Sequence, residues 1–483
     1  MADYKAQIVV IAGGPSGLSA AVQAASDGAD VILIEKNNVV GGAANMGMGP
    51  LAIESHIQKR QMVDLTVEKA YRMFMEYTHY NVDGRLVKRY FEQSAETIEW
   101  LEEMGVEFEG AFRYFTKSEP TWHIVKKGDG IGPRSASKMN LALYARAQEL
   151  GVRFLMETAG KKILKDDSGK VCGVLAVDKT GKEIEIECKA AIICTGGGGA
   201  NPEFIKEQTG YTFNEDMFNF AIPGNVGDGI KMAWEAGVDK LPVRIEHAAT
   251  IYGMDELPQS VPNVMLQPNL LVNLDGKRVM DEEQMQNTTF LSNAASHQKG
   301  RILYSIVDTS IVKYYIRNGV DEICMVRMEE DVSDFMDGVK MAEETGKGLY
   351  AADTIEELAE KLGINADNLV ETVEDYNTYC DGYDEEFFKR RKYLRPLRKG
   401  PFYAAAIRPG GYGTVGGIRI NENCECCDSN FDKIPGLYAA GADACNIYDD
   451  SYMFLLPGNS MGFAVNTGRI AGMEAFSYVD DEE

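Results

Sequence analysis

Short apolar runs that end at glycine turns recur along the chain, and they predict strands buried on both faces of a sheet. The clearest runs cover residues 8–11, 31–35, 191–194 and 434–440. Continuous apolar runs of this length are typical of parallel strands. The segment between the first two runs is predicted to be a helix, so the chain opens with a βαβ unit.

Other stretches show helical or alternating patterns. Apolar residues at helical spacing predict helices over residues 87–101 and 138–150, and Gly105 and Gly151 follow as stops. Short strands are predicted over residues 152–156, 171–177 and 183–188. Turns are predicted at residues 167–169 and 179–181, before the second and the third of these strands. These strands indicate a β-meander beside the parallel sheet. Thr354 and Glu357 form a capping-box pattern before an amphipathic helix.

The pattern changes at about residue 241 and returns to its first form at about residue 398. We therefore predict an α/β fold with two domains. A Rossmann-like domain with a β-meander comprises residues 1–240 and 398–483, and an α+β domain over residues 241–397 is inserted into it. A cleft between two domains is a common substrate site.

The first glycine turn has the spacing of a dinucleotide-binding motif. Gly14 lets a pyrophosphate approach the backbone, Gly17 lets the helix pack closely, and Glu35 ends the second strand where a carboxylate would bind ribose hydroxyls. Ala12 replaces the first glycine of G-x-G-x-x-G, which weakens the motif. A glycine-rich turn in some other α/β domain is the alternative interpretation.

Further glycine turns favour a flavin over a nicotinamide. Gly41 and Gly42 follow Glu35 too soon for the next helix of a nicotinamide-binding fold, and they supply a second backbone surface. Thr195-Gly196-Gly197 and Gly441 each follow another predicted buried strand. The longer cradle suits a flavin nucleotide, so the Rossmann-like domain is expected to bind FAD.

Composition excludes several classes of partner. Lys and Arg number 49 against 74 Asp and Glu, and the net charge of −25 disfavours nucleic acid and anionic membrane surfaces. No apolar run approaches the roughly 20 residues that span a bilayer. The first residues carry no pattern of a cleaved leader, so we expect a cytoplasmic protein.

The nine cysteines have no regular spacing, which suits a reducing compartment. Cys424, Cys426 and Cys427 cluster, but no second pair has ligand spacing. We expect structural thiols on the solvent side and no metal site. No C-x-x-C-H occurs, so covalent haem is not expected.

Together the motifs resemble the flavoprotein subunit family of fumarate reductase and succinate dehydrogenase, which includes ketosteroid dehydrogenases. The matching motifs are Gly14-x-x-Gly17, Glu35, Gly41-Gly42, Thr195-Gly196-Gly197, Gly227-Asp228-Gly229, Asn273-x-Asp275-Gly276-Lys277-Arg278, Thr414-x-Gly416-Gly417 and Gly468-Arg469-Ile470-Ala471-Gly472. The resemblance implies FAD, a mobile capping domain and reaction at flavin N5 near the interdomain cleft. It also implies that the helix opened by Gly458-Asn459-Ser460 points its positive end at the flavin pyrimidine ring.

The motifs and the resemblance nominate a set of cofactor-binding residues. They are Gly14, Ser16, Gly17, Glu35, Lys36, Gly42, Ala43, Ala44, Thr195, Gly196, Asp228, Gly441, Ala442, Gly458, Asn459 and Ser460. Succinate dehydrogenases of the family attach the flavin through a histidine after the second glycine turn. Ala44 and Asn45 stand at that place, so the resemblance implies non-covalent FAD.

Departures from the family argue against a dicarboxylate substrate, which needs charged, bidentate partners. His247 matches one family histidine, but residues 283–289 and 454–457 hold none of the family's arginines. Gly413 replaces a second histidine, and Tyr412 lies beside it. A bulky aromatic or polycyclic small molecule is therefore expected against an apolar lining. The lining candidates are Met46, Met48, Tyr412, Met453, Phe454 and Leu455.

His247, Tyr412 and Arg408 are the catalytic candidates, because hydride transfer from flavin N5 requires a group that manages a proton or a carbonyl. The resemblance suggests reductive loss of the 4-hydroxyl of tetrahydrodaidzein, which gives equol. A ketosteroid or enone reductase or dehydrogenase is the alternative. A flavoprotein that only carries electrons is an alternative of another class. No second dinucleotide unit is visible, so the electron donor stays unknown.

Overall fold

The apolar runs predicted as buried strands form one sheet in the computed structural model. Its order is β17-β18-β10-β2-β3-β6, and all neighbours are parallel except β17 and β18. The strands are β2 (Ile8–Ile11), β3 (Val31–Glu35), β6 (Arg153–Met156), β10 (Ala190–Ile193), β17 (Glu425–Cys427) and β18 (Lys433–Ala439). Every residue of β2, β3 and β10 is buried, as continuous apolar runs require.

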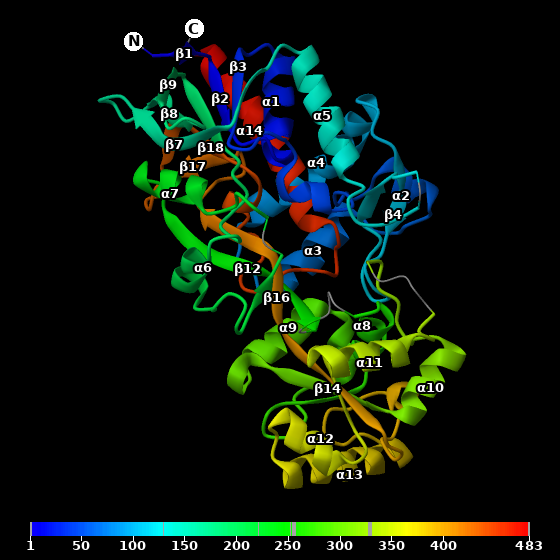
Figure 1. The fold of residues 1–483 in the computed structure, drawn as a ribbon. Coiled ribbons are helices and arrows are strands. Elements are labelled where there is room, and N and C mark those ends of the chain that lie inside the picture. Colours follow the sequence, from blue (N-terminus) through cyan, green and yellow to red (C-terminus); the bar gives the residue numbers. More distant parts are fainter. Residues whose placement is uncertain are drawn as a thin grey trace.

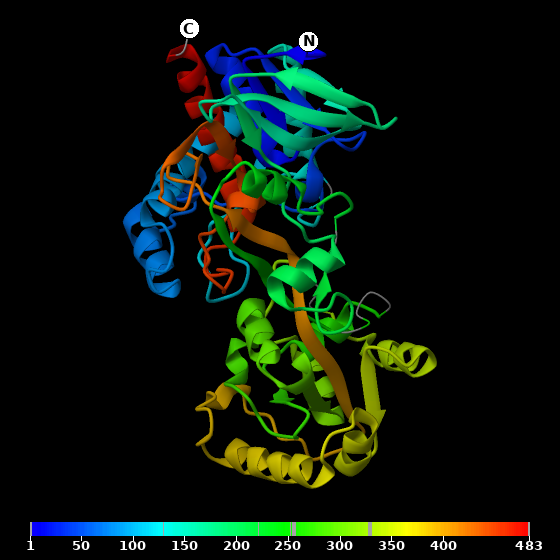
Figure 2. The ribbon, with the colours of Figure 1, turned by 90° about the vertical axis from the view of Figure 1, so that its left-hand side faces the viewer.

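The structure describes residues 2–481 except 129, 221, 252, 254–256 and 327–330. Figure 1 shows two lobes, of which the upper one holds the parallel sheet and both termini. The long strands β12 (Lys240–Ile251) and β16 (Phe402–Ile418) pair antiparallel and run from the upper lobe into the lower one (Figure 2). The predicted α/β architecture with an insertion is confirmed.

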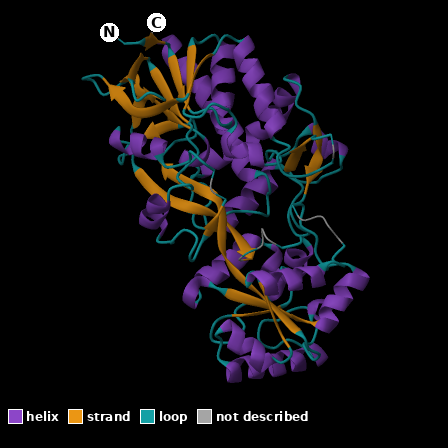
Figure 3. Ribbon diagram, viewed as in Figure 1, coloured by secondary structure: helices purple, strands orange, loops and turns teal. Residues whose placement is uncertain are grey.

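Helices α1 (Pro15–Asp27) and α14 (Asn459–Asp481) pack against each other beside the parallel sheet (Figure 3). A Cβ on Gly468 would lie 2.2 Å from the carbonyl oxygen of Ser16, and one on Gly472 would lie 2.5 Å from that of Ala20. The two backbones therefore meet directly. This close contact holds the N-termini of both helices at one edge of the sheet.

The meander differs from the prediction. Residues 153–156 join the parallel sheet as β6, and the second sheet has the order β1-β9-β8-β7. Its strands are β1 (Tyr4–Lys5), β7 (Thr158–Lys165), β8 (Val171–Asp178) and β9 (Glu183–Glu187). Glu157, between β6 and β7, has a φ of 54°, and this left-handed kink redirects the chain from one sheet to the other. The sequence pattern carried no sign of that turn.

The N-terminus of α12 (Ile355–Leu362) is capped as predicted, with one difference. The Thr354 hydroxyl accepts the backbone N–H of Glu357 at 3.2 Å. The Glu357 carboxylate accepts the N–H of Asp353 at 3.2 Å instead of the N–H of Thr354. The return bond therefore lies one residue earlier than in a capping box.

The lower lobe has its own hydrophobic core, built from residues between Ala249 and Ile407, whereas Ala248 and Val415 belong to the core of the upper lobe. The cores thus divide partway along β12 and β16. The lobe comprises β13 (Leu270–Val272), β14 (Leu303–Asp308), β15 (Leu349–Ala352), α8 (Ser260–Met265), α9 (Thr288–Ser296), α10 (Thr309–Asn318), α11 (Phe335–Thr345), α12 and α13 (Ala366–Asp381).

The remaining elements belong mostly to the upper lobe. The helices are α2 (His56–Arg60), α3 (Val67–Tyr77), α4 (Gly84–Glu103), α5 (Ser137–Glu149), α6 (Pro202–Thr209) and α7 (Asp228–Glu235), and the strands are β4 (Phe108–Phe112), β5 (Trp122–Val125) and β11 (Phe218–Asn219). The predicted helices over residues 87–101 and 138–150 are therefore confirmed within a few residues at their ends. A loop after β4 reaches the lower lobe, where the N–H of Met325 donates to the carbonyl of Tyr114 at 2.9 Å.

The expectation of solvent-side thiols at Cys424, Cys426 and Cys427 is wrong, because all three side chains are buried beside the parallel sheet. In the described part of the chain every cysteine is a free thiol. No group of three or more His, Cys, Asp or Glu within the described ranges is arranged to hold a metal ion. No described helix is both long and apolar enough to cross a membrane.

Candidate active site

A cavity of about 620 Å³ opens at the carboxyl edge of the parallel sheet, beside the first turns of α1 and α14. This is the edge where open α/β sheets bind ligands. The predicted cofactor residues that line it are Gly14, Ser16, Glu35, Lys36, Gly42, Ala43, Ala44, Thr195, Gly196, Asp228, Ala442, Gly458 and Ser460. Gly17, Gly441 and Asn459 are buried and lie outside the lining.

The first glycine turn leaves space where a phosphate would need it. A Cβ on Gly14 would meet no atom within 4 Å, whereas one on Gly17 would lie 1.9 Å from the carbonyl oxygen of Ala12. Gly14 therefore keeps the cradle open and Gly17 brings the helix against the strand. Ala12 has a φ of 86°, so an alanine holds the left-handed turn usually assigned to glycine.

Two acids at this end of the cavity already have partners. The Glu35 carboxylate accepts the N–H groups of Gly13 at 2.8 Å and Asn37 at 2.7 Å. Lys36 forms an ion pair with Asp228 at 2.8 Å across the cavity wall. These contacts hold β3 and the start of α7 together around the adenosine end that the motif predicts.

Asp443, which sequence reasoning missed, builds the third glycine turn. Its buried carboxylate accepts the N–H groups of Gly196 at 3.1 Å and Gly197 at 2.8 Å, and it also bonds the N–H and hydroxyl of Thr195. Burial raises the pKa of Asp443, while these donors lower it. Only the folded chain reveals the role, because the acid lies far along the sequence from its partners.

The second glycine turn opens the 3₁₀ helix η1 (Gly42–Met46). The Asn140 amide donates to Asn45 Oδ1 at 2.8 Å and to the carbonyl of Gly41 at 3.3 Å, which ties α5 to the turn. Ala44 faces the cavity here. The turn thus presents backbone, the methyl groups of Ala43 and Ala44 and the Met46 side chain to a ligand.

Aromatic side chains from distant segments line the other end of the cavity. Phe220 and Tyr412 stack with ring centroids 5.3 Å apart, and Tyr412 meets Phe454 edge-on at 6.4 Å. Tyr114 stacks on Phe454 with ring centroids 4.5 Å apart. We call Phe220, Tyr412, Phe454 and Tyr114 the aromatic wall. Such a wall suits a flat, uncharged ring.

Among the lining residues that the structure describes, Lys36 is the only cation. It is paired with Asp228 at the glycine-turn end. Met46 and Met48 line the cavity as expected, whereas Met453 is buried in the core and Leu455 packs against it. Of the residues that the structure describes, none at the aromatic end supplies a cationic clamp for carboxylates.

Strand β12 carries the candidate His247 and, next to it, Glu246, which the sequence analysis did not propose. Glu246 lines the cavity, and its carboxylate accepts the hydroxyl of Ser460 at 3.0 Å. Its neighbour His247 lies outside the lining, with Nδ1 bonded to Ser292 of α9 at 3.0 Å. Burial lowers the pKa of His247 to about 4. Successive side chains of a strand point to opposite faces, so only one of the pair can reach the cavity.

Of the other catalytic candidates, Tyr412 lines the cavity. Arg408, four residues earlier on β16, donates to the carbonyl of Gly300 at 2.9 Å and lies outside the lining. The structure thus brings Tyr412 to the site and places Arg408 and His247 away from it. The nearby residue Tyr452 also lines the cavity, and its hydroxyl accepts the N–H of Ser460 at 3.2 Å.

Comparisons with known proteins agree with this geometry. The family model for the FAD binding domain matches residues 7–461. The vinyl phenol reductase of Lactiplantibacillus plantarum is 31% identical over 98% of this chain and 97% of its own length. The fumarate reductase (cytochrome) of Shewanella frigidimarina is 28% identical over 98% of this chain and 77% of its own length.

The fold is also similar to that of a solved structure. The 3-ketosteroid-Δ4-(5α)-dehydrogenase of Rhodococcus jostii superposes with a TM-score of 0.78 and 22% identity, covering 99% of this chain and 98% of that one. The cradle at Gly14, the glycine turns and the N-terminus of α14 fit an extended flavin dinucleotide. The chain therefore belongs to the FAD binding domain family, as an FAD-dependent oxidoreductase of the fumarate reductase flavoprotein type.

Proposed function

We propose that this enzyme reduces phenolic small molecules by placing a hydride on a benzylic carbon para to the phenol. The observation that carries the proposal is the aromatic wall, which lines the cavity, while the only cation among the described lining residues is Lys36, already paired with Asp228. A dicarboxylate leaving water would need cationic partners there. A phenol ring needs apolar contact and one or two polar groups.

A relative supports the same substrate class. The vinyl phenol reductase that covers almost the whole chain is named for a phenol that carries a reducible vinyl group. Tetrahydrodaidzein shares the reactive unit, because its 4-hydroxyl lies on a benzylic carbon para to a phenol. We propose tetrahydrodaidzein, reduced to equol, as the specific substrate within this class.

Bound FAD, when reduced, supplies a hydride from N5. The aromatic wall would orient the phenol ring over the reacting face and exclude water from it. The Tyr412 hydroxyl can hydrogen-bond a phenolate or a carbonyl oxygen. Since an ionised phenol pushes electrons toward its para carbon, loss of the hydroxyl or protonation of the vinyl group creates an electron-poor benzylic carbon for the hydride.

A ketosteroid or enone reductase is the second candidate. Tyr412 favours it, because a tyrosine hydroxyl in an apolar cavity can polarise a substrate carbonyl. We propose no role in the chemistry for His247 or Arg408, and we infer that each fixes its strand through its bond to Ser292 or Gly300.

The substrate class is tested by single turnover. Anaerobically reduced enzyme is mixed with 4-vinylphenol, tetrahydrodaidzein, a 3-ketosteroid enone or fumarate, and flavin reoxidation is followed by visible absorbance. We expect the phenols to reoxidise the flavin at least about 100-fold faster than fumarate, because a lost charged contact costs about 3 kcal/mol or more.

The matched control is 4-vinylanisole, in which a methyl ether prevents ionisation of the phenol. It should bind the aromatic wall and leave the flavin reduced. Fast reoxidation by fumarate alone would contradict the proposal, and reoxidation by the enone alone would favour the second candidate. Reoxidation by ferricyanide but by no carbon substrate would favour a flavoprotein that only carries electrons.

We further propose that FAD is held without a covalent bond, since Ala44 and its neighbours at η1 present no nucleophilic side chain to the cavity. Acid precipitation of the holoenzyme should release all of the yellow colour into the supernatant. Colour that stays with the precipitated protein would contradict this.

The free cysteines of the described chain support a reducing, cytoplasmic compartment.

A further inference from the structure

Three acidic side chains of the described residues line the cavity, and they differ in their partners. Glu35 accepts two backbone N–H groups, and Asp228 is paired with Lys36. Within the described part of the chain Glu246 has neither kind of partner, and its carboxylate accepts the hydroxyl of Ser460 at 3.0 Å. Glu246 is therefore the lining acid whose carboxyl is not already committed to holding the fold or neutralising a cation.

The surroundings of Glu246 belong to the aromatic end of the cavity. Ser460 opens α14, and its N–H donates to the hydroxyl of Tyr452 at 3.2 Å. The ring of Tyr452 meets Phe454 of the aromatic wall with centroids 4.8 Å apart. The strand β16, which carries Tyr412, pairs with the strand that carries Glu246. The carboxyl thus lies beside the part of the cavity where the proposed phenol ring would bind.

We propose that Glu246 is the proton donor of the reaction and delivers its carboxyl proton to the substrate as the hydride enters the benzylic carbon. This inference rests on the proposed function for its substrate. It assigns a catalytic role to the residue beside His247, on the face of β12 that looks into the cavity.

For tetrahydrodaidzein, the proton of Glu246 goes to the 4-hydroxyl oxygen, and the bond between C4 and oxygen breaks to release water. The phenolate electron pair forms a quinone methide, and the hydride from reduced FAD then adds to C4. For a vinyl phenol, the same proton goes to the terminal carbon, and the hydride adds to the benzylic carbon. In each case the reduced flavin loses two electrons with the hydride and is oxidised to FAD. Glu246, left as a carboxylate, then takes a proton from water.

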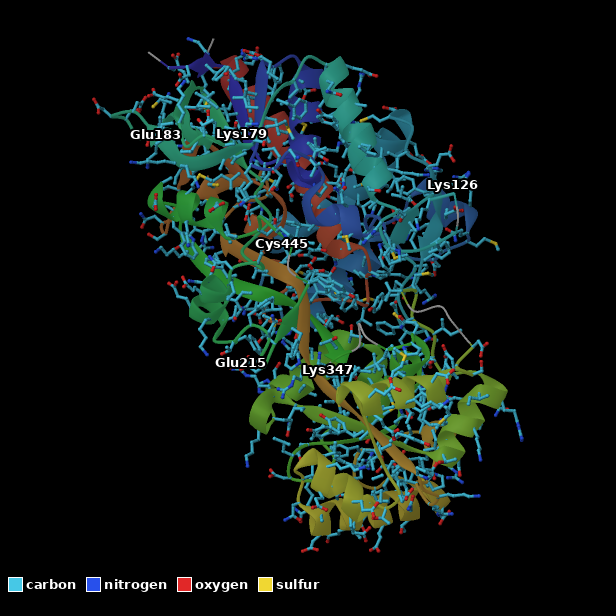
Figure 4. All side chains as sticks on the ribbon, viewed as in Figure 1. Lys126, Lys179, Glu183, Glu215, Lys347 and Cys445 are labelled. Carbon is cyan, nitrogen blue, oxygen red and sulfur yellow. The ribbon has the colours of Figure 1, made fainter. Side chains whose placement is uncertain are left out.

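The chemistry requires a protonated carboxyl near neutral pH. Burial raises the pKa of Glu246 to about 7, although its bonds to Ser460 and Tyr452 lower it. The titratable groups closest to it are Tyr452, Tyr448 and Cys445, whose pKa values burial raises well above their usual range. All three are therefore neutral at this pH. Cys445 is marked inside the upper lobe in Figure 4.

The elements packed against β12 add no charge beside the carboxyl. The charged residue on the paired part of β16 is Arg408, which bonds the carbonyl of Gly300 at the far part of the strand. Helix α9 has no charged side chain. Helix α6 carries Lys206, which bonds Thr212, and exposed Glu203 and Glu207. His247 faces α9, and its depressed pKa keeps it neutral.

The test compares Glu246→Gln with Glu246→Asp and with Glu203→Gln, an exposed control of the same chemical change. General acids contribute about 10²–10⁴-fold, so Glu246→Gln should slow flavin reoxidation by the phenol at least about 100-fold. Glu246→Asp should recover part of the rate, and Glu203→Gln should match the wild type. Ferricyanide needs no carbon protonation, so it should reoxidise all four proteins equally fast.

The pH profile separates proton donation from a structural role. The donor form is the neutral acid, so the wild-type profile should carry a limb that falls as pH rises through about 7, added to the effect of phenol ionisation, which the Glu246→Gln variant shares. Glu246→Gln should lose this limb. A rate within about threefold of wild type, or an unchanged pH limb, would overturn the assignment. A parallel loss with ferricyanide would mean that the variant lost FAD or its fold, which also overturns it.

The design separates this inference from the proposed function. If phenols fail to reoxidise the wild-type flavin, the proposed substrate class fails. The same variants are then compared with the 3-ketosteroid enone, whose reduction also needs a proton on carbon. A 100-fold loss there would retain Glu246 as proton donor for a different substrate, and an unchanged rate would remove it from the chemistry.

Discussion

Replacing Asp443 by alanine is expected to lower the free energy of unfolding by about 3–5 kcal/mol and to abolish retention of FAD on a desalting column. The carboxylate accepts the backbone N–H groups of Thr195, Gly196 and Gly197. A buried donor left without a partner costs about 1–3 kcal/mol. The turn that these groups form lines the cavity, so its loss should remove both stability and the cradle.

Asp428→Ala is the matched control, because its partly exposed carboxylate also accepts backbone N–H groups, those of Asn430 at 2.8 Å and Asp432 at 3.1 Å. Water can replace those bonds, so the expected loss is below about 1 kcal/mol, with FAD retained. Denaturant unfolding measures both variants. A loss below about 1 kcal/mol for Asp443→Ala would mean that the glycine turn holds its shape without the acid.

Gly17→Ala and Gly14→Ala are expected to fail in different ways. A Cβ on Gly17 would lie 1.9 Å from the carbonyl oxygen of Ala12, so α1 must move from β2. We expect apoprotein stability to fall by about 2–4 kcal/mol, the range of severe packing clashes. A Cβ on Gly14 would meet no protein atom within 4 Å. The apoprotein should keep its stability and lose at least about tenfold in FAD affinity.

Thermal unfolding of the apoproteins and titration with FAD measure the two effects separately. The contrast depends on Gly14 facing the ligand and Gly17 facing the fold. If Gly14→Ala bound FAD as tightly as the wild type, the pyrophosphate would not lie over this turn. If Gly17→Ala left the stability unchanged, the strand and helix would have enough freedom to separate.

Much of the fold could be predicted because its signals are local. Apolar runs predicted β2, β3 and β10, and glycine spacing predicted the turns that follow them. Two errors have non-local causes. The kink at Glu157, which moves a strand to another sheet, depends on which neighbours the strand finds. The burial of Cys424, Cys426 and Cys427 depends on what packs over β17.

For the cofactor site, motifs nominated mostly residues that line the cavity, since parallel strands bring their glycine turns to one edge by a general rule. No such rule predicts which residues line the substrate part of the cavity. Phe220, Tyr114 and Phe454 come from three separate loops, and only packing stacks them with Tyr412. The spacing of those residues in the sequence does not predict that their rings contact one another.

The sequence by itself thus determined the fold class and the FAD-binding family, and it predicted a site without the family's cationic clamp, because each depends on residue type at a position within a local motif. It could not choose between Glu246 and His247, which are adjacent in the chain. The tertiary structure decided, because a strand sends adjacent side chains to opposite faces and only the packing of β12 against α9 and α14 defines which face meets the cavity.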